Sequence, residues 1–323
     1  MAGLELVVTR EQAGRTVKSL LRGELGLSAT LIGRLKRTET GLAVNGSRVY
    51  TSAVLREGDR LTVDLAAAER AAHVDPAPMN LDVLFEDEHL LVVNKPAPLA
   101  CIPSSLVPGE PTLAAGLLYH LGEGASLHLV NRLDRGTTGV TAAAKNAYVH
   151  NLLRERLHTG AFRRTYLAVC IGAPEPEAGQ VSLPIGRDPS SAIKRQVDPS
   201  GKPAETAYRV LLKNGGLTLV ELTPRTGRTH QLRVHMAALG CPLAGDWLYG
   251  TEDRELIARP ALHAARLELI HPVTGEALAL EAPLPEDIRI LLERDSDGRV
   301  DFSGSGVEHH ILPQQIRGES PLP

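Results

Sequence analysis

Residues 131–139 (NRLDRGTTG) bring together the side chains of this chain that are best suited to chemistry. Asp134 lies between Arg132 and Arg135 in the sequence, so a carboxylate is flanked by two guanidinium groups. Positive charge nearby keeps a carboxylate ionised, and guanidinium groups also bind phosphate. The stretch therefore combines an anionic nucleophile or base with groups that hold an anionic ligand. Read alone, an Asp near Gly in a polar loop is typical of a turn, so the rest of the chain has to decide.

The segments around this stretch predict how it is held. Short apolar runs at residues 127–130 and 140–144 flank it, which predicts a loop between two strands. A loop on a rigid scaffold presents its side chains to ligands. Asn146 is then expected to cap a helix that ends before Gly160.

Two further segments carry candidate side chains. Residues 163–170 (RRTYLAVC) predict a strand that carries Tyr166. A helix is expected to begin in residues 226–236 (TGRTHQLRVHM) and to end at Gly240, a residue type that stops helices. Taken singly, Tyr166 is typical of a half-buried strand aromatic and Arg233 of a salt-bridge arginine.

His230 and His235 raise the question of a metal site. Their spacing is not that of His-Glu-x-x-His, and no cysteine lies near them in the sequence. We therefore expect no metal ion here. Asp246, in the segment GDWLYG, is interpreted as a structural turn residue.

The composition is that of an ordinary globular protein. Of its 323 residues, 43% are hydrophobic and 23% are charged, which allows two domains and a substantial core. The apolar runs are too short for a membrane span, and the N-terminus lacks the pattern of a secretion signal. Three widely separated cysteines predict free thiols in a reducing compartment. We therefore expect a cytoplasmic protein.

Positive charge is concentrated in parts of the chain. The formal net charge is −3, but residues 1–65 hold 10 Lys and Arg against 7 Asp and Glu. Residues 131–166 hold 7 basic residues against 2 acidic ones. Local basic fields indicate phosphate binding better than the total charge does. Both regions therefore favour a nucleic-acid partner.

The order of the expected elements indicates an α+β fold. Strands come in runs, with helices between them that do not alternate strictly with single strands. This order favours a large mixed, mainly antiparallel sheet flanked by helices over residues 81–295. Residues 66–80 predict a linker rich in Ala and Pro, and residues 303–323 a disordered tail. The expected strands of the large sheet cover residues 81–86, 89–94, 163–170, 206–212, 217–222, 265–270 and 277–281, and the remaining helices lie at 112–121 and from residue 286.

Residues 1–65 predict a small α/β domain. Helices are expected over residues 14–23 and after Ser28, a typical N-cap. An Asn45-Gly46 turn then joins two short strands, and a further strand follows at residues 60–65. The pattern LxVNGxxV, followed by GDxLxV, resembles the alpha-L RNA-binding module of ribosomal-protein S-four type. The alternative is a solvated basic face on an unrelated domain. The residues expected to bind RNA are Arg15, Lys18, Arg34, Lys36 and Arg37.

Three separated motifs together resemble the pseudouridine synthases of RluA type. They are RLDRGTTG at residues 132–139, RRTYLAV at 163–169 and GRTHQLRVH at 227–235, and KPAP at 95–98 is similar to the family's KPAG turn. The resemblance covers roughly residues 81–285. It implies an enzyme that isomerises uridine in RNA to pseudouridine. Together with the N-terminal module it implies large-subunit ribosomal RNA as substrate, with transfer RNA as the alternative.

The resemblance implies a role for each motif residue. Asp134 would be the catalytic nucleophile, and Tyr166 the aromatic group against the target base. Arg233 would pair with the Asp134 carboxylate, and Arg132 would enter the stack where the base had been. Further substrate-binding residues would be Arg135, Lys194, Arg228 and His230.

Two positions depart from the family pattern. Asn131 stands where the family usually has His, and Pro98 stands where it usually has Gly. Both lie outside the set of Asp134, Tyr166 and Arg233. They bear on loop packing and on which RNA is recognised.

The reaction explains these residue types. Pseudouridine forms when the bond between the ring nitrogen and the sugar breaks and carbon 5 is joined instead. No atom is added and no redox change occurs, so we expect no cofactor and no metal. We also expect that the protein is a monomer, that its partner is RNA and that it does not bind a membrane. Extruding a base costs a few kcal/mol, of which stacking on an aromatic ring returns about 1–3 kcal/mol. Asp134 attacks the sugar or the base, or takes a sugar proton, and the sequence leaves these routes open.

Two other classes of protein remain as alternatives. The first is a non-catalytic RNA-binding assembly factor with the same fold. Loss of Asp, Tyr or Arg from the motifs would favour it, but all three are present in this sequence. A hydrolase that uses the histidines would need a nucleophile in a sharp strand-to-helix turn, or metal spacing. The sequence shows neither pattern.

Overall fold

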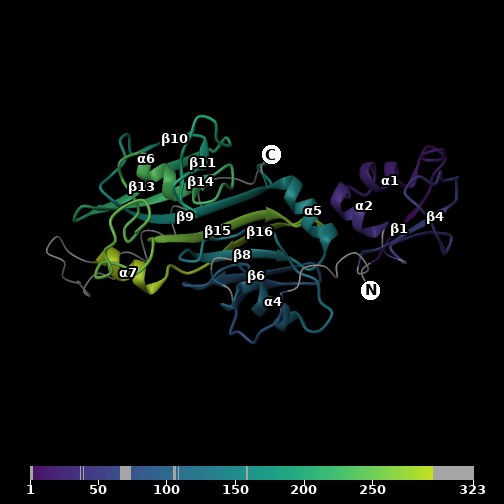
Figure 1. Ribbon diagram of the computed structural model, residues 1–323, viewed down its shortest axis with the longest axis horizontal. Helices are drawn as coiled ribbons and strands as arrows, with labels where there is room; N and C mark the ends of the chain where they lie inside the picture. Colours follow the sequence, from purple (N-terminus) through teal and green to yellow (C-terminus); the bar gives the residue numbers. More distant parts are fainter. Residues whose placement is uncertain are drawn as a thin grey trace.

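Ten strands form one large sheet, which carries most of the chain (Figure 1). The computed structural model describes residues 3–36, 38, 40–65, 74–104, 107, 109–157 and 159–293. The linker expected at 66–80 therefore lies partly outside the described residues, and the tail expected at 303–323 lies entirely outside them. The strands of the large sheet are β5 (Asp82–Glu86), β6 (Leu90–Lys95), β7 (His128–Leu129), β8 (Thr138–Ala144), β9 (Phe162–Ile171), β10 (Ala178–Val181), β13 (Thr206–Asn214), β14 (Leu217–Pro224), β15 (Leu262–Ile270) and β16 (Ala277–Glu281).

The order of the strands confirms the expected mixed, mainly antiparallel sheet. The main path runs β10-β13-β14-β9-β15-β8-β6-β5, with β16 paired to β15 and β7 to β8. Strand β15 runs parallel to β8, whereas its pairs with β9 and β16 are antiparallel. The parallel pair lies in the middle of the sheet, directly after the loop that carries Asp134.

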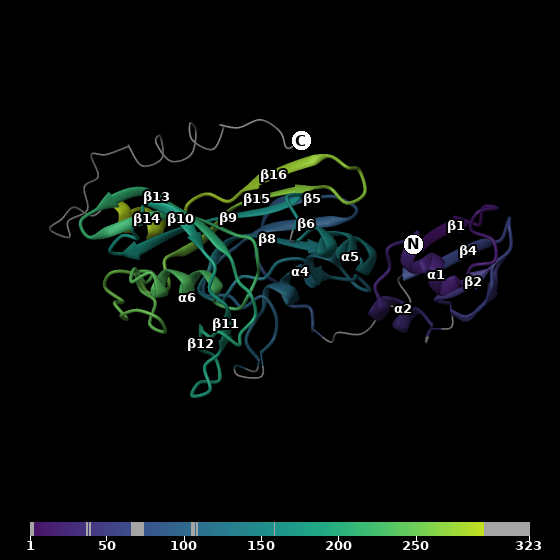
Figure 2. The same cartoon turned by 90° about the horizontal axis from the view of Figure 1, so that it is seen from above.

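Side chains that alternate along each strand build a core on both faces of the sheet. In β9, Tyr166 and Ala168 belong to one buried cluster and Leu167 and Val169 to another. Helices α4 (Leu113–Leu121) and α6 (Gln231–Ala238) pack on the Tyr166 face. Helix α7 (Glu286–Glu293) packs on the opposite face. Helices α4 and α6 lie on the same side of the sheet (Figure 2), and the pocket that Tyr166 lines opens on that side.

The N-terminal module, residues 3–65, contains the helices, the hairpin and the last strand that its sequence predicts, and also a first strand, Gly3–Val7, that was not expected. Ser28 caps α2 by accepting a hydrogen bond from the Leu31 amide at 3.1 Å. The turn at Asn45-Gly46 has positive φ at both residues (53° and 80°), as a tight hairpin turn requires. The elements of the module are β1 (Gly3–Val7), α1 (Val17–Gly23), α2 (Ala29–Leu35), β2 (Leu42–Val44), β3 (Ser47–Arg48) and β4 (Arg60–Asp64).

The module packs against helix α5 (Ala147–Arg156) of the sheet domain. Ala147 is buried in the core cluster of the module, and Tyr148 packs against the same cluster. The Asn151 side chain donates a hydrogen bond to the Gly26 carbonyl oxygen. The start of α5 is fixed by Asn146, which caps the Val149 amide at 2.8 Å as predicted.

Helix α6 begins at Gln231, inside the expected stretch of residues 226–236, and residues 226–230 form a loop before it. The Gln231 side chain explains this loop, because its oxygen accepts hydrogen bonds from the Thr226 hydroxyl (2.7 Å) and the Arg228 amide (3.0 Å). These bonds satisfy loop groups that a longer helix would have paired internally.

Gly139, at the start of β8, is required by its close approach to β15. Its φ is +109°, and an added Cβ would lie 2.2 Å from the Ala264 carbonyl oxygen. We predict that Gly139→Ala lowers the free energy of unfolding by about 3 kcal/mol or more, because it combines a clash with an unfavourable φ. Urea unfolding monitored by circular dichroism measures this. Gly160→Ala is the matched control, because a Cβ there meets nothing within 4 Å, and equal stability of the two variants would contradict the prediction.

Candidate active site

A pocket of about 600 Å³ opens between the Asp134 loop, strand β9 and the loop before α6. Asp134, Tyr166 and Arg233, which come from the three separated motifs, all line it. This volume lies within the range of pockets that enclose a small ligand. Other side chains that line the pocket are Arg132, Leu133, Arg135, Arg164, Arg228, His230, Leu232 and Leu262.

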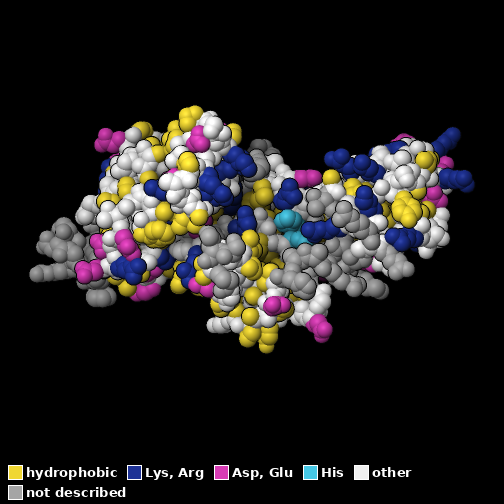
Figure 3. Space-filling model, in the orientation of Figure 1, with side chains coloured by type: hydrophobic (Ala, Val, Ile, Leu, Met, Phe, Trp, Pro, Cys, Tyr) yellow, Lys and Arg dark blue, Asp and Glu magenta, His cyan; other side chains and the backbone are white. Residues whose placement is uncertain are grey.

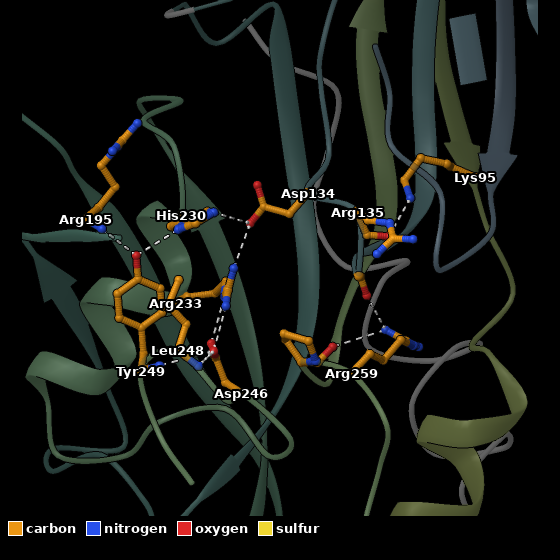
Figure 4. A network of polar contacts seen from close by, with 12 residues as sticks. Lys95, Asp134, Arg135, Arg195, His230, Arg233, Asp246, Leu248, Tyr249 and Arg259 are labelled. Carbon is orange, nitrogen blue, oxygen red and sulfur yellow. Dashed lines mark hydrogen bonds and ion pairs between the residues drawn. The ribbon is translucent and has the colours of Figure 1, made fainter. Parts of the chain in front are cut away.

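Asp134 is approached by two nitrogen-bearing side chains from the region of α6 (Figure 4). Arg233 Nη1 lies 3.5 Å from Asp134 Oδ2, and His230 Nε2 lies 3.9 Å from the same oxygen. Both contacts involve Oδ2, so the other carboxylate oxygen, Oδ1, is directed away from His230 and Arg233. The arrangement holds an ionised carboxylate by one edge and leaves the other edge for a ligand.

Arg233 is fixed by a second carboxylate, that of Asp246. Two short bonds join them, Nε to Oδ2 at 2.7 Å and Nη2 to Oδ1 at 2.6 Å, and both side chains are almost completely buried. Burial by itself lowers the pKa of Arg233, but the bonds to Asp246 and the charges of Asp246 and Asp134 raise it above its ordinary value. Arg233 therefore stays charged and presents its remaining nitrogen to Asp134.

Asp246 does more than the structural turn role that the sequence predicted for it. It does shape a turn, since its Oδ1 accepts from the amides of Leu248 (3.1 Å) and Tyr249 (3.3 Å). Its main partner, however, is the Arg233 guanidinium. The segment GDWLYG thus supplies the support for the arginine, and its position shortly after the HQLR motif, with Asp246 13 residues beyond Arg233, was the signal available in the sequence.

Strand β9 contributes an aromatic and a cationic side chain to the pocket. Tyr166 is almost completely buried, and burial raises the pKa of its phenol. Arg164 lies two residues earlier on β9, on the same face because side chains alternate along a strand. Its Nη2 reaches the carbonyl oxygens of Pro224 and Thr226 at 3.4 Å each. Arg164 was missed in the sequence, although its spacing from Tyr166 places it in the pocket.

A buried lysine and a half-buried arginine anchor the backbone of the Asp134 loop. Lys95 Nζ donates to the carbonyl oxygens of Pro96 and Leu99 at 2.8 Å and of Arg135 at 3.4 Å. Burial lowers the pKa of Lys95 to about 8. On the other side, Arg259 Nη1 donates to the Gly136 carbonyl oxygen at 3.1 Å (Figure 4). The loop is therefore held at consecutive residues by charge-assisted hydrogen bonds.

The loop arginines do not supply the charge frame expected around Asp134. Arg135 is exposed and pairs with Glu110 at 2.8 Å. Arg132 is exposed at the pocket, whereas Arg233 and His230 contact the carboxylate. The side chains that contact the Asp134 carboxylate thus come from a distant part of the sequence, and not from the two arginines next to Asp134.

The other predicted substrate-binding residues divide into two groups. Arg228 lines the pocket, and its Nε donates to the Pro203 carbonyl oxygen at 3.0 Å. Lys194 belongs to the hairpin of β11 (Ile185–Arg187) and β12 (Arg195–Val197) and is not among the described residues that line the pocket. The structure brings Arg228 and His230 to the pocket of Asp134 and places Lys194 on the neighbouring hairpin.

Asn131 bridges the loop to strand β8. Its amide nitrogen donates to the Val140 carbonyl oxygen at 3.1 Å, and its oxygen accepts from the Ala142 amide at 2.8 Å. The side chain thereby pairs with backbone groups of β8 as a neighbouring strand would. Cys101, a buried free thiol, similarly contacts the backbone of Leu133 at 3.3 Å. Both residues hold the backbone on either side of Arg132.

The described part of the chain offers neither a metal site nor a membrane span. No group of three His, Cys, Asp or Glu side chains there is placed to hold a metal ion. Among the same residues, no helix is both long and apolar enough to cross a bilayer.

The sequence of the chain matches a known family. Residues 89–238 match the family described as RNA pseudouridylate synthase. A protein of Bacillus subtilis (strain 168), named "Uncharacterized RNA pseudouridine synthase YjbO", is 42% identical over 277 residues, which cover 85% of this chain and 97% of that protein. The ribosomal large subunit pseudouridine synthase D of Nitrosomonas europaea is 42% identical over 224 residues, or 66% of this chain and 64% of that protein.

A solved structure has a similar fold. It is that of the human RNA pseudouridylate synthase domain containing 4, with a TM-score of 0.52 and 29% sequence identity. The match covers 64% of this chain and 90% of that one. With a relative 42% identical along nearly its whole length, the chain belongs to the RNA pseudouridine synthase family of isomerases, as its RluA-type motifs predicted.

Proposed function

We propose that the protein isomerises specific uridines of large-subunit ribosomal RNA, with Asp134 as the catalytic nucleophile. The observation that carries this proposal is the convergence of Asp134, Tyr166 and Arg233 on one pocket, with Arg233 3.5 Å from the carboxylate. Asp134 is half-buried at the pocket, where a flipped nucleotide would reach it. A carboxylate held by one oxygen keeps the other free to attack the sugar or the base, or to take a sugar proton.

The surrounding side chains supply what base flipping needs. Tyr166 offers an aromatic face in the pocket wall, which stabilises an extruded base by about 1–3 kcal/mol. Arg132, exposed at the pocket entrance, would fill the space that the base leaves in the RNA. Arg135, Arg228 and His230 would contact the target nucleotide and its neighbours, and Lys194 would contact RNA at the hairpin.

The choice of ribosomal RNA rests on two observations. The relative from Nitrosomonas europaea is named a ribosomal large subunit pseudouridine synthase, and the resemblance of residues 1–65 to an S-four-type module suggests a second RNA contact. Lys18, Arg34 and Lys36 are exposed on α1 and at α2, where Figure 3 shows a gathering of basic side chains on the module. Arg15 is instead paired with Glu24 at 2.6 Å, and Arg37 lies outside the described residues.

Release of tritium tests the isomerisation. Ribosomal RNA transcribed with uridine labelled at carbon 5 loses its tritium to water when carbon 5 is joined to the sugar. Incubation with the protein should release tritium in proportion to the number of modified sites. Mapping pseudouridine in total RNA from a deletion strain then identifies the positions. Release from transfer RNA alone would contradict the choice of ribosomal RNA.

RNA binding should depend steeply on salt and on the basic face of the N-terminal module. Each Lys or Arg that neutralises a phosphate releases counterions, so the logarithm of affinity falls linearly with the logarithm of salt concentration. We predict that Lys18→Glu and Arg34→Glu each weaken RNA binding about tenfold while the rate at saturating RNA is unchanged. Filter binding across a salt series measures this. Arg209→Glu, on strand β13, is the control, and a flat salt response would contradict the assignment.

A further inference from the structure

A chain of polar contacts leads from the β11–β12 hairpin to Asp134, with Tyr249 at its centre (Figure 4). The Tyr249 hydroxyl accepts a hydrogen bond from the Arg195 backbone amide at 2.8 Å. The same oxygen lies 2.8 Å from His230 Nδ1. His230 Nε2, on the other side of the ring, lies 3.9 Å from Asp134 Oδ2.

The protonation of His230 follows from the donors and acceptors at Tyr249. A phenol carries one hydrogen, and the oxygen of Tyr249 already accepts from Arg195. Its hydrogen can therefore be donated to His230 Nδ1, which lies 2.8 Å away. In that arrangement the proton of the neutral ring is on Nε2 and faces the Asp134 carboxylate. The opposite tautomer would turn a lone pair toward that carboxylate and leave the phenol hydrogen without its acceptor.

Tyr249 also contacts the second group that faces Asp134. The Arg233 guanidinium carbon lies 5.0 Å from the centre of the Tyr249 ring, within the range of a cation–π contact. The rings of His230 and Tyr249 meet edge to face, with centroids 5.6 Å apart. Tyr249 is half-buried and is not among the described residues that line the pocket. It therefore contacts His230 and Arg233, which line the pocket, rather than the pocket itself.

The backbone at His230 points to the same role. His230 adopts the left-handed conformation, with φ 59° and ψ 16°, at the position before α6. Residues other than Gly rarely adopt it, and where they do, the surrounding structure must hold them. The His230 side chain makes no capping bond to the helix. Its contacts with Tyr249 and Asp134 account for the side chain's orientation in place of a cap.

We propose that Tyr249 is a positioning residue for the isomerisation, whose hydroxyl holds His230 as the Nε2–H tautomer that donates toward Asp134. Through the Arg195 amide, the same hydroxyl ties this donor to the β11–β12 hairpin, which carries Arg187, Lys194 and Arg195. The inference rests on the proposed role of Asp134. It also implies that the hairpin does more than bind RNA. RNA bound at the hairpin would stabilise the position of His230 beside the Asp134 carboxylate.

A neutral donor suits this position better than a charged one. Burial lowers the pKa of His230, and the positive charges of Arg233 and Arg195 lower it further, against the carboxylates of Asp134 and Asp246. A protonated His230 would form a full ion pair with Asp134 and make it a weaker nucleophile. It would also donate from Nδ1, which would displace the hydrogen of the Tyr249 hydroxyl.

Tyr249→Phe removes the hydroxyl and keeps the ring, so it distinguishes the effects of these two groups. The aromatic contacts with Arg233 and His230 remain, whereas the bonds to Arg195 and Nδ1 are lost. We expect the single-turnover rate of pseudouridine formation to fall about tenfold at pH 7.5, because the hydrogen bond that fixes the His230 ring is lost, with the KM for RNA unchanged. The loss should grow as the pH falls from 8 to 6, because the freed Nδ1 then takes up a proton. Tyr208→Phe removes a buried phenol elsewhere in the sheet core and should keep the wild-type rate.

A double-variant cycle distinguishes positioning from a structural effect. His230→Gln replaces the ring by an amide that donates without titrating, so adding Tyr249→Phe should slow it no further. Equal losses in both backgrounds, or a wild-type rate and pH profile for Tyr249→Phe, would overturn the inference. Asp134→Asn is measured in parallel. If Asp134→Asn kept its activity, the proposed function itself would fail, whatever Tyr249→Phe shows.

Discussion

Asp134→Asn should abolish pseudouridine formation while leaving the fold intact. The substitution preserves the shape of the side chain and removes the anionic oxygen to which we assign the reaction with the substrate. We expect the rate to fall at least about 10³-fold, as for other catalytic nucleophiles. Release of tritium from uridine labelled at carbon 5, measured in single turnover, gives the rate.

RNA binding and a matched substitution complete this experiment. The Asp134→Asn variant should bind RNA as tightly as the wild type or more tightly, because a negative charge near the phosphates is gone. Asp82→Asn makes the same change on β5, where Asp82 accepts a hydrogen bond from Asn94 at 2.9 Å, and should keep the wild-type rate. Measurable turnover by Asp134→Asn above about one tenth of the wild-type rate would exclude a nucleophilic role.

Asp246→Ala should have the largest effect on stability. It leaves the Arg233 guanidinium buried without the carboxylate that holds it by two bonds of 2.6 and 2.7 Å. Removing one partner of a buried ion pair costs about 3–5 kcal/mol. We expect a decrease of that size in the free energy of unfolding, measured by urea denaturation followed by circular dichroism.

Two further variants test the reason for this loss. Glu252→Ala removes the partner of Arg254 in an exposed ion pair and should change stability by less than about 1 kcal/mol. The double variant Arg233→Met with Asp246→Leu removes both buried charges and should be more stable than Asp246→Ala, although it cannot hold Asp134. A double variant as unstable as Asp246→Ala would show that lost packing, rather than an unpaired charge, explains the effect.

The sequence predicted most elements because their signals are local. Ser28 and Asn146 cap helices as expected, and Asn45-Gly46 forms the turn that its residue types favour. The observed start of α6 at Gln231 lies in the expected stretch of residues 226–236, but the sequence did not show the loop before it, because the Gln231 side chain binds the Thr226 hydroxyl and the Arg228 amide of that loop. A side chain that competes with the backbone is not visible in periodicity.

The site was predicted from the combination of motifs rather than from any one of them. Asp134, Tyr166 and Arg233 share a pocket, but their roles stay predictions until the variants are measured. The partners of Arg135 and Arg233 could not be predicted, because Glu110 and Asp246 are brought to them by the tertiary fold. The sequence suggested that Arg132 and Arg135 surround Asp134 with positive charge. In the fold, Arg233 and His230 contact its carboxylate instead.

The two cations that anchor the Asp134 loop have a consequence for how this enzyme could diverge. Lys95 and Arg259 bind main-chain carbonyl oxygens, which a residue of any type supplies. The side chain at Arg135 can therefore change without releasing the backbone that carries Asp134. If the rim of the pocket contacts RNA as proposed, mutation there can alter those contacts while the Asp134 carboxylate keeps its place. Single substitutions could then change which uridine is bound without moving the proposed nucleophile.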